Sequence, residues 1–214
     1  MKLYHFAGSA SAFRVRIALN FKNISYEGIS IDITKGEQFA PEYLKVNPVG
    51  VVPSLSHEGR VLTESLAIIE YLDEIRPNPP LLPTDPADRA RVRAIALSMA
   101  CGIQPLHPGR IVNYLTKEIG APGDKAQAWC THWIDLGMRA VETLISADGK
   151  AGKFCHGDEV SLADTVLVPQ IYVGVNRFKM DFSKSCPTAW RIYQNCMALP
   201  AFERAAPHVV AKAA

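Results

Sequence analysis

Two hydroxyl side chains near the N-terminus lie where an apolar strand pattern gives way to a helical one. Ser9 and Ser11 follow the strand-like segment 3–6 and open the run 13–19, whose wide apolar face predicts a helix. The first backbone N–H groups of a helix have no intrahelical partner, and the helix dipole is positive there. An anion, including a thiolate, is stabilised at such a position. Ser9 is therefore a candidate hydrogen-bond donor to a bound thiolate, with Ser11 as a second candidate, and ordinary helix capping is the alternative for both.

Two further segments have the composition of ligand-binding turns. Val52-Pro53 lies just ahead of a predicted strand. The sequence alone favours a proline at the start of an edge strand, and the alternative is a cis bond that turns the polar backbone groups of Val52 toward a ligand. Glu64 and Ser65 lie where a predicted hairpin ends and a helix begins. Ser65 and the adjacent N–H groups can bind a carboxylate and Glu64 can contact an ammonium group, while capping would use the same residues.

Motifs spread along the chain resemble those of the glutathione transferase superfamily, and the run that contains Ser9 is most similar to the zeta class. Members of that class include maleylacetoacetate isomerase and maleylpyruvate isomerase. The motifs in chain order are SASAFRVRIAL (9–19), SLAIIEYL (65–72), GIQPL (102–106), GDEVSLAD (157–164) and LVPQ (167–170). The resemblance implies the glutathione transferase fold: an α+β thioredoxin-like N-terminal domain at 1–82, followed by an all-α C-terminal domain at 87–214. It also implies a homodimer.

The resemblance implies glutathione as the cofactor and gives roles to the matching residues. Ser9 aligns with the catalytic serine of the class, and Val52-Pro53 aligns with its cis-proline. Gln104 resembles a contact to glutathione from the helical domain. The pair that matches the binding site for the γ-glutamyl end of glutathione is Glu64-Ser65.

The sequence departs from the zeta pattern at the first helix. Ala10 replaces a serine, and Ser11 stands where the class usually has a cysteine. Ser11 keeps a hydroxyl two residues beyond Ser9, so it remains a candidate for the catalytic site. These changes bear on the identity of the substrate more than on the binding of glutathione.

The substrates of the class are small dicarboxylates, and arginine is the cation best shaped to pair with a carboxylate. Arg110 and Arg177 lie in segments that match substrate-contacting parts of the class, and Arg14 lies beside the serine turn. A solvated helix face or a structural ion pair is the alternative for each arginine, and it applies most to Arg14 and its neighbour Arg16. His107 is either a proton donor or an ordinary loop residue.

The resemblance implies cis–trans isomerisation of maleylacetoacetate or maleylpyruvate. The glutathione thiolate adds to a cis double bond, the resulting single bond rotates, and the thiolate leaves. One alternative is a zeta-class transferase with conjugating or dehalogenating activity, although dehalogenation is disfavoured because Ser11 replaces the cysteine. The other is a non-catalytic glutathione-binding protein, against which the retention of Ser9, Arg110 and Arg177 argues.

The elements expected to position these residues alternate between strand and helix in the first third of the chain. Strands are predicted at 2–5 and 25–31, a hairpin at 51–56 and 60–63, and helices at 13–23 and 64–75. Five prolines between 77 and 86 mark a linker. The remainder is predicted to be helical, with helices at 85–100, 124–145, 162–175 and 187–197. Ser161 and Asp164 have the spacing of a capping box.

Composition narrows the class of protein. The net charge is +2, from 23 basic and 21 acidic residues, and no long basic stripe indicates nucleic-acid binding. We expect a cytoplasmic protein without a membrane segment, because the sequence has no export signal and no apolar run near 18 residues. The five cysteines lack C-x-x-C spacing and are expected to be reduced and mostly buried. The histidines show no metal-site spacing.

Overall fold

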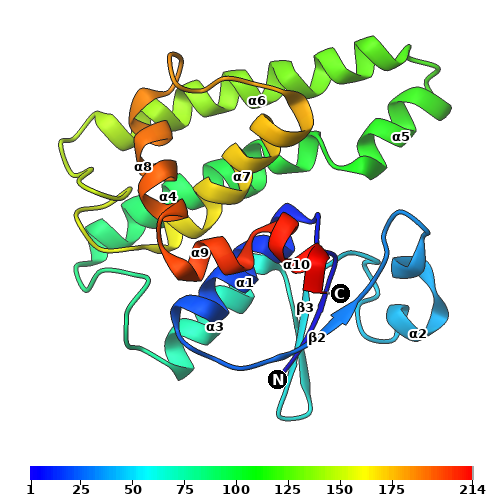
Figure 1. The fold of residues 1–214 in the computed structure, drawn as a ribbon, viewed down its shortest axis with the longest axis horizontal. Helices are drawn as coiled ribbons and strands as arrows, with labels where there is room; N and C mark the ends of the chain where they lie inside the picture. The colour runs from blue at the N-terminus through cyan, green and yellow to red at the C-terminus, as the bar shows by residue number, and fades with distance from the viewer. Residues whose placement is uncertain (214) are drawn as a thin grey trace. The chain divides into compact units, whose positions relative to one another are not determined.

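Residues 1–213 are described by a computed structural model of the chain. They form two compact units, drawn in Figure 1. The first unit comprises Met1–Leu81 together with the segment that begins at Met197, and the second comprises Leu82–Cys196. The domain limits 1–82 and 87–214 stay a prediction. The compact units differ from them in one respect, because the C-terminal segment packs with the first unit.

A four-stranded mixed sheet forms the framework of the first unit. The strands are β1 (Lys2–His5), β2 (Glu27–Ser30), β3 (Ser54–His57) and β4 (Arg60–Thr63). Their order is β2-β1-β3-β4, with β1 and β2 parallel and β3 antiparallel to both β1 and β4. The parallel strands β1 and β2 require a crossover, which the first helix supplies. The antiparallel strands β3 and β4 are joined by a tight turn. The α+β, thioredoxin-like arrangement expected from the sequence is confirmed.

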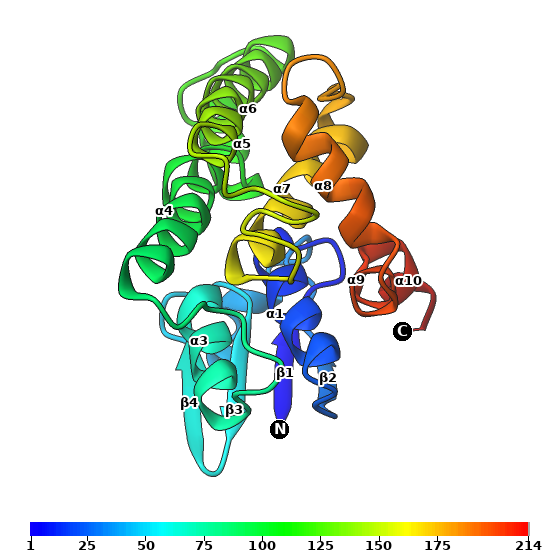
Figure 2. The same cartoon turned by 90° about the vertical axis from the view of Figure 1, so that its left-hand side faces the viewer.

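Helix α1 (Ala10–Phe21) lies at the centre of the first unit. Figure 2 shows α3 (Ser65–Ile75) and α9 (Pro200–Ala205) on either side of it, and both helices contact it. Residues 12–19 are all buried, so α1 is enclosed on every face. A helix enclosed in this way need not be amphipathic, which explains why α1 has apolar residues on every face. The shorter helices of the unit are η1 (Glu37–Phe39), α2 (Pro41–Leu44) and α10 (Pro207–Ala213).

The second unit is all-helical. Its helices are α4 (Pro86–Gly102), η2 (Gln104–Leu106), α5 (Gly109–Lys117), α6 (Gly123–Ser146), α7 (Leu162–Phe178) and α8 (Pro187–Met197). Helix α7 is the most buried, and α4 and α6 pack against it. The predicted capping box starts α7: Oδ2 of Asp164 accepts hydrogen bonds from the backbone N–H and the hydroxyl of Ser161, at 2.8 and 2.7 Å.

A buried lysine ties α1 to the beginning of the proline-rich linker. Nζ of Lys22 lies 2.7 Å from Oδ1 of Asp73 on α3, and it donates to the carbonyls of Arg76 at 2.7 Å and Pro79 at 2.8 Å. The Lys22 side chain is completely buried. Its charge is thus compensated by one carboxylate and two carbonyls, as a buried cation requires. This contact closes the end of α3 and fixes the chain as it leaves the first unit.

Two predicted features needed correction. Helix α1 begins at Ala10 rather than at residue 13, because the cap residue Ser9 already turns the chain into the helix. Helix α5 was not among the predicted helices, and it begins at Gly109, directly after Pro108. Proline is tolerated at a helix start, where its missing N–H would have no partner. The cysteines are free thiols as expected; Cys101 is exposed and the other four are buried.

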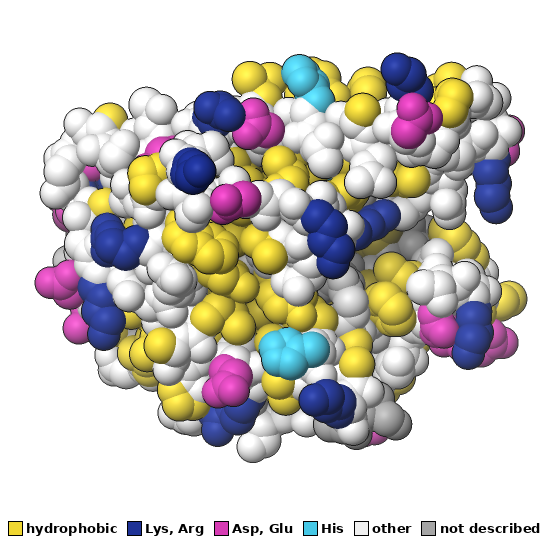
Figure 3. Space-filling view, turned by 45° about the horizontal axis from the view of Figure 1, so that its top comes forward, with side chains coloured by type: hydrophobic (Ala, Val, Ile, Leu, Met, Phe, Trp, Pro, Cys, Tyr) yellow, Lys and Arg dark blue, Asp and Glu magenta, His cyan; other side chains and the backbone are white. Residues whose placement is uncertain are grey.

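The surface carries charges of both signs. On the face that Figure 3 shows, apolar side chains gather in the middle, and basic and acidic side chains lie around them. Among the helices within residues 1–213, none combines the length and apolar character needed to cross a bilayer.

Candidate functional site

Ser9 is the N-cap of α1, so its side chain is held at the positive end of the helix. Its backbone is extended, with φ −76° and ψ 121°, and its Oγ accepts a hydrogen bond from the N–H of Ala12 at 3.2 Å. A serine hydroxyl has one proton to donate and two lone pairs to accept with. The cap uses only an accepting lone pair, which leaves the proton available for a ligand. Capping and donation to an anion are therefore compatible at Ser9.

The first turn of α1 provides the second part of an anion site. The N–H groups of Ala10 and Ser11 are the first of the helix and have no intrahelical acceptor. The turn contains no acidic residue, so no carboxylate offsets the positive end of the helix dipole. Ser11 is half-buried in this turn. The N-terminus of α1 can thus stabilise a negative charge next to Ser9.

A second helix start with the same chemistry belongs to α3. Ser65 is buried at its first position, and the turn carries no acidic residue. Glu64, just before it, is exposed and has φ +66°, a left-handed conformation that non-glycine residues rarely adopt. Such strain costs on the order of 1–3 kcal/mol and is found disproportionately at functional sites. The backbone is thus held in an unusual shape where the sequence predicted a binding pair.

Arg14 connects the two helix starts. Its side chain is 2% exposed, and its Nη1 donates a hydrogen bond to Oγ of Ser65 at 3.2 Å. The guanidinium therefore places positive charge beneath Ser65, which favours an anion bound there. Because Arg14 is buried, the alternative of a solvated helix face is wrong for this residue. Its role in binding substrate stays a prediction.

The Val52–Pro53 peptide bond is cis. The edge-strand interpretation of the proline is wrong, because the following strand β3 lies between β1 and β4. Two side chains hold the turn before this bond. The hydroxyl of Tyr43 and Nδ2 of Asn47 both donate to the carbonyl of Val51, at 2.6 and 2.9 Å. Burial raises the pKa of Tyr43, so its hydroxyl remains a proton donor.

The sequence pattern does not single out Tyr43 or Asn47. Asn47 also belongs to a local turn, because its Oδ1 accepts a hydrogen bond from the N–H of Val49 at 3.1 Å. Asparagine followed by proline is a turn signal, so the sequence indicates only this local role. The signal that could have found the second role is the need of a buried turn for hydrogen-bond partners.

The remaining predicted residues lie in the second unit. Gln104 is half-buried in η2, while Arg110 on α5 and Arg177 near the end of α7 are exposed. The Arg177 guanidinium lies 5.0 Å from the centre of the Phe178 ring, and its Nη1 lies 3.5 Å from the carbonyl oxygen of His107. Stacking on an aromatic ring restrains a long side chain while leaving its donors free to bind an anion.

His107 is buried rather than part of an exposed loop. It is 3% exposed, and its Nε2 lies 3.3 Å from the side-chain amide of Gln170 on α7. Its N–H donates to the carbonyl of Gln104 at 3.4 Å. His107 thus links η2 to α7, and it sits between Gln104 and Arg177. The structure therefore brings these two predicted residues into one local cluster, and Arg110 follows on the next helix.

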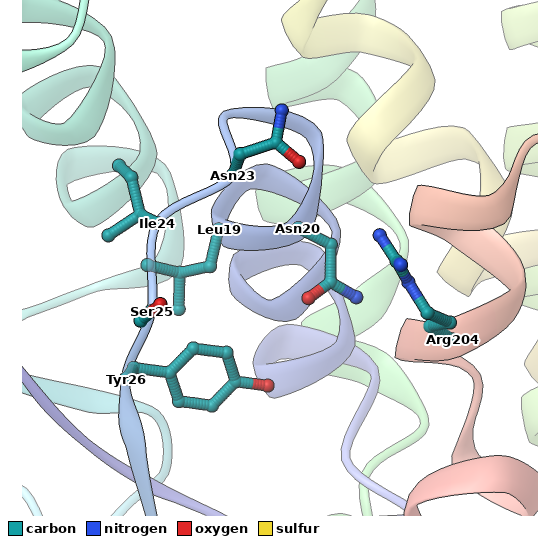
Figure 4. A pocket seen from close by; sticks show the side chains of 7 residues that line it. All are labelled: Leu19, Asn20, Asn23, Ile24, Ser25, Tyr26 and Arg204. Atoms are coloured by element: carbon teal, nitrogen blue, oxygen red, sulfur yellow. The ribbon is translucent and has the colours of Figure 1, made fainter.

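A metal centre and a cavity are two other kinds of site that the described residues could provide. No grouping of three metal-binding side chains occurs within residues 1–213. A cavity of about 460 Å³ lies at the far end of α1 and is drawn in Figure 4. Its lining residues are Leu19, Asn20, Asn23, Ile24, Ser25, Tyr26 and Arg204. Helix geometry places it about 15 Å along α1 from the N-terminus, so it is separate from the site at Ser9.

Comparisons with known proteins agree with the local geometry. The family model described as "Glutathione S-transferase, N-terminal domain" matches residues 3–80. A maleylpyruvate isomerase from Ralstonia sp. is 42% identical over 207 residues, which cover 97% of each chain. The holo structure of a bacterial maleylpyruvate isomerase, a zeta-class glutathione S-transferase, matches with a TM-score of 0.94 at 41% identity and covers 98% of each chain. The maleylacetoacetate isomerase of Methylobacterium extorquens AM1, solved with malonate and glutathione, matches with a TM-score of 0.93 at 40% identity, covering 98% of this chain and 97% of that one.

Proposed function

The chain belongs to the glutathione S-transferase family, in its zeta class, and on that premise we propose that it is a glutathione-dependent cis–trans isomerase of maleylacetoacetate or maleylpyruvate. One observation carries the proposal: helices α1 and α3 of one unit both have a first turn without acidic residues, and Arg14 on α1 donates to Ser65 at the start of α3. Glutathione carries two kinds of negative charge, a thiolate and carboxylates, and both are stabilised at helix starts.

The residues of the first unit fit glutathione. The α3 start with Ser65 suits the carboxylate of the γ-glutamyl end, and the exposed Glu64 carboxylate suits its ammonium group. The cis turn at Val52 presents backbone groups to an extended peptide, and the turn is held by buried donors to the carbonyl of Val51. Gln104 is the proposed contact from the helical unit. When bound, glutathione supplies a sulfur nucleophile that can add to a conjugated double bond and leave again.

Ser9 is the proposed catalytic residue because its hydroxyl can stabilise the ionised sulfur. A free thiol has a pKa near 8.5, so only a few per cent is ionised at neutral pH. Lowering that pKa by about 2 units requires about 2.7 kcal/mol of preferential stabilisation of the thiolate. A charge-assisted hydrogen bond from Ser9 together with the N–H groups and dipole of α1 can supply this amount. Ser11, in the same turn, is the second catalytic candidate.

The arginines of the second unit give the site its preference for carboxylates. Arg177 is restrained by stacking on Phe178, and its planar guanidinium can bind a carboxylate through two parallel hydrogen bonds. Arg110 is exposed near the start of α5 and is proposed as the second carboxylate contact. Holding the carboxylates of the substrate orients its double bond toward the sulfur that attacks it. Arg14 is buried, so we assign it to the support of Ser65.

Kinetic assays of the purified protein with glutathione and each cis-diketo acid test this function. Isomerisation of one acid identifies the substrate. Ser9→Ala is expected to lower kcat by about 10- to 100-fold while the affinity for glutathione changes only a few-fold. Ser11→Ala is the matched control, because it removes a hydroxyl from the same turn but keeps the cap, and we expect a smaller loss.

Other results of these assays would contradict the proposed isomerase activity or the proposed role of Ser9. Conjugation of chloroarenes without isomerisation of either acid would indicate a transferase. Tight binding of glutathione without any turnover would indicate a binding protein. An equal loss of turnover and glutathione affinity in Ser9→Ala would mean that Ser9 only positions the tripeptide.

We also propose that the chain is a cytoplasmic homodimer. Support comes from the family and from the small net charge of +2, which does not oppose self-association. Light scattering coupled to size-exclusion chromatography gives the mass directly. A mass of one chain at working concentrations would contradict the dimer.

A further inference from the structure

Arg16 makes an unusual set of contacts in the first unit. It is completely buried in the middle of α1. Its Nη1 and Nη2 donate to the carbonyls of Phe6 and Ala7, at 3.2 and 2.9 Å, and its Nε donates to the carbonyl of Ala205 on α9 at 2.9 Å. One guanidinium therefore binds both the loop between β1 and α1 and the C-terminal segment of the chain.

The charge of Arg16 has no carboxylate partner among the described residues. Burial lowers its pKa to about 10, so it is still protonated at neutral pH. His5 lies 3.4 Å from Nη1, and burial together with Arg16 lowers the pKa of His5 to about 4, which keeps the imidazole neutral. Tyr26 also faces this charge. A buried cation bound mainly by backbone carbonyls is costly, and replacing it by an apolar residue would avoid that cost.

The loop held by Arg16 leads directly to the proposed catalytic residue. The N–H of Ser9 donates to the carbonyl of Phe6 at 3.1 Å, and this is the carbonyl that also accepts from Arg16. The Phe6 oxygen is thus a shared acceptor between the guanidinium and Ser9. A displacement of the loop would change the direction of the Ser9 hydroxyl and of the first N–H groups of α1. Small displacements of this kind weaken catalysis strongly.

We propose that Arg16 is a positioning residue for the thiolate site: its planar fork holds the Phe6–Ala7 loop so that Ser9 is directed at the glutathione sulfur, and its Nε couples this loop to α9. The proposal rests on the proposed function. It also explains why an arginine rather than a lysine stands here, because only a guanidinium presents donors in three fixed directions. The Arg16 charge, which has no carboxylate partner within residues 1–213, lies on the same helix as Ser9 and adds to the stabilisation of a thiolate.

The test is the pKa of glutathione bound to variants that keep the fold. Arg16→Lys retains the charge but loses the fork, and Arg16→Met loses both. Asn20→Ala is the matched control: Nδ2 of Asn20, one turn further along α1, donates to the carbonyl of Ala201 on α9 at 3.1 Å, and the side chain is seen beside α9 in Figure 4. It therefore weakens the contact between α1 and α9 without touching the loop. The thiolate is titrated by its ultraviolet absorbance, and unfolding by urea is measured for each variant.

We expect Arg16→Lys to raise the pKa of the bound thiol by about 0.5–1 unit and to lower kcat/KM by about tenfold, whereas Asn20→Ala leaves the thiol pKa unchanged. An unchanged thiol pKa in folded Arg16→Lys would overturn the proposal, and so would an equal shift in Asn20→Ala. If Arg16→Met does not fold, the comparison of Arg16→Lys with Asn20→Ala decides alone. Absence of isomerase activity in the unmodified protein would contradict the proposed function but would leave this comparison intact, since it needs only bound glutathione.

Discussion

Arg14 and Arg16, two residues apart on α1, show how burial decides the role of a side chain. Arg14 donates to a hydroxyl at the start of α3, and Arg16 donates to three backbone carbonyls. The sequence offered substrate binding, a solvated helix face or a structural ion pair for both. Neither residue is exposed, and the described structure gives Arg16 no acidic partner. Cations thus support both proposed anion sites of the first unit from within the protein.

Glu64 allows the cost of backbone strain to be separated from ligand binding. Glu64→Gly removes the penalty of a positive φ, although glycine also adds entropy to the unfolded chain. We expect the free energy of unfolding to stay within about 1 kcal/mol of the unmodified protein, while glutathione binds about tenfold more weakly. Glu64→Gln is the control, because it keeps the backbone strain and loses only the charge. A loss above 2 kcal/mol in Glu64→Gly, on the scale of a disrupted buried bond, would show that the side chain maintains the turn.

At the scale of elements, local chemistry was predictable and distant contacts were not. The capping box at Ser161 and Asp164 could be recognised from spacing, and so could the hairpin and the first crossover helix. Helix α5 was missed because Pro108 and Gly109 resemble a loop. The contact between Arg16 and Ala205 joins residues 189 positions apart. Only the folded chain brings such residues together, so Arg16 could be noticed in the sequence but not given its role.

The carboxylates at the starts of α7 and α4 differ in burial, and we expect them to contribute differently to the free energy of unfolding. The carboxylate of Asp164 is buried and accepts three hydrogen bonds, from Ser161 and from the N–H of Cys155. Burial raises its pKa, and these bonds act in the opposite direction. Asp164→Ala should cost about 3 kcal/mol of unfolding free energy, since it leaves buried donors without acceptors.

Asp85→Ala is the matched control for that prediction. Asp85 caps α4 by accepting from the N–H groups of Ala87 and Asp88, but it is exposed to water. Its removal should cost about 1 kcal/mol, the usual value for a cap. Urea denaturation measures both variants, and equal losses would contradict the account of the buried cap.

For the whole molecule, the notable feature is that one compact unit combines segments from both the N-terminal and the C-terminal parts of the sequence. The C-terminal segment belongs to the same compact unit as β1 and α1, and the side chains of Phe202 and Ala205 are fully buried in it. The proposed thiolate site therefore depends on residues from both ends of the sequence. A division of the chain into an N-terminal and a C-terminal domain at the linker omits this dependence.

Phe202→Ala tests the contribution of the C-terminal segment. Removing a buried aromatic ring leaves a cavity, and we expect a loss of about 3–4 kcal/mol in the free energy of unfolding, together with weaker glutathione binding. Phe39→Ala is the control, because Phe39 is 60% exposed and should lose less than about 1 kcal/mol. Urea denaturation and glutathione titration measure the two effects. A loss below 1 kcal/mol for Phe202→Ala, typical of a surface site, would show that the segment is dispensable.

The central claim is that this chain holds the sulfur of glutathione in its ionised form at the start of α1. The most direct test is an ultraviolet titration of the thiolate in the complex, compared with free glutathione and with the Ser9→Ala complex. We predict a thiol pKa about 2 units below the free value in the unmodified protein, and a partial return toward the free value in Ser9→Ala. A thiol that titrates in the complex as it does in plain buffer would contradict the account.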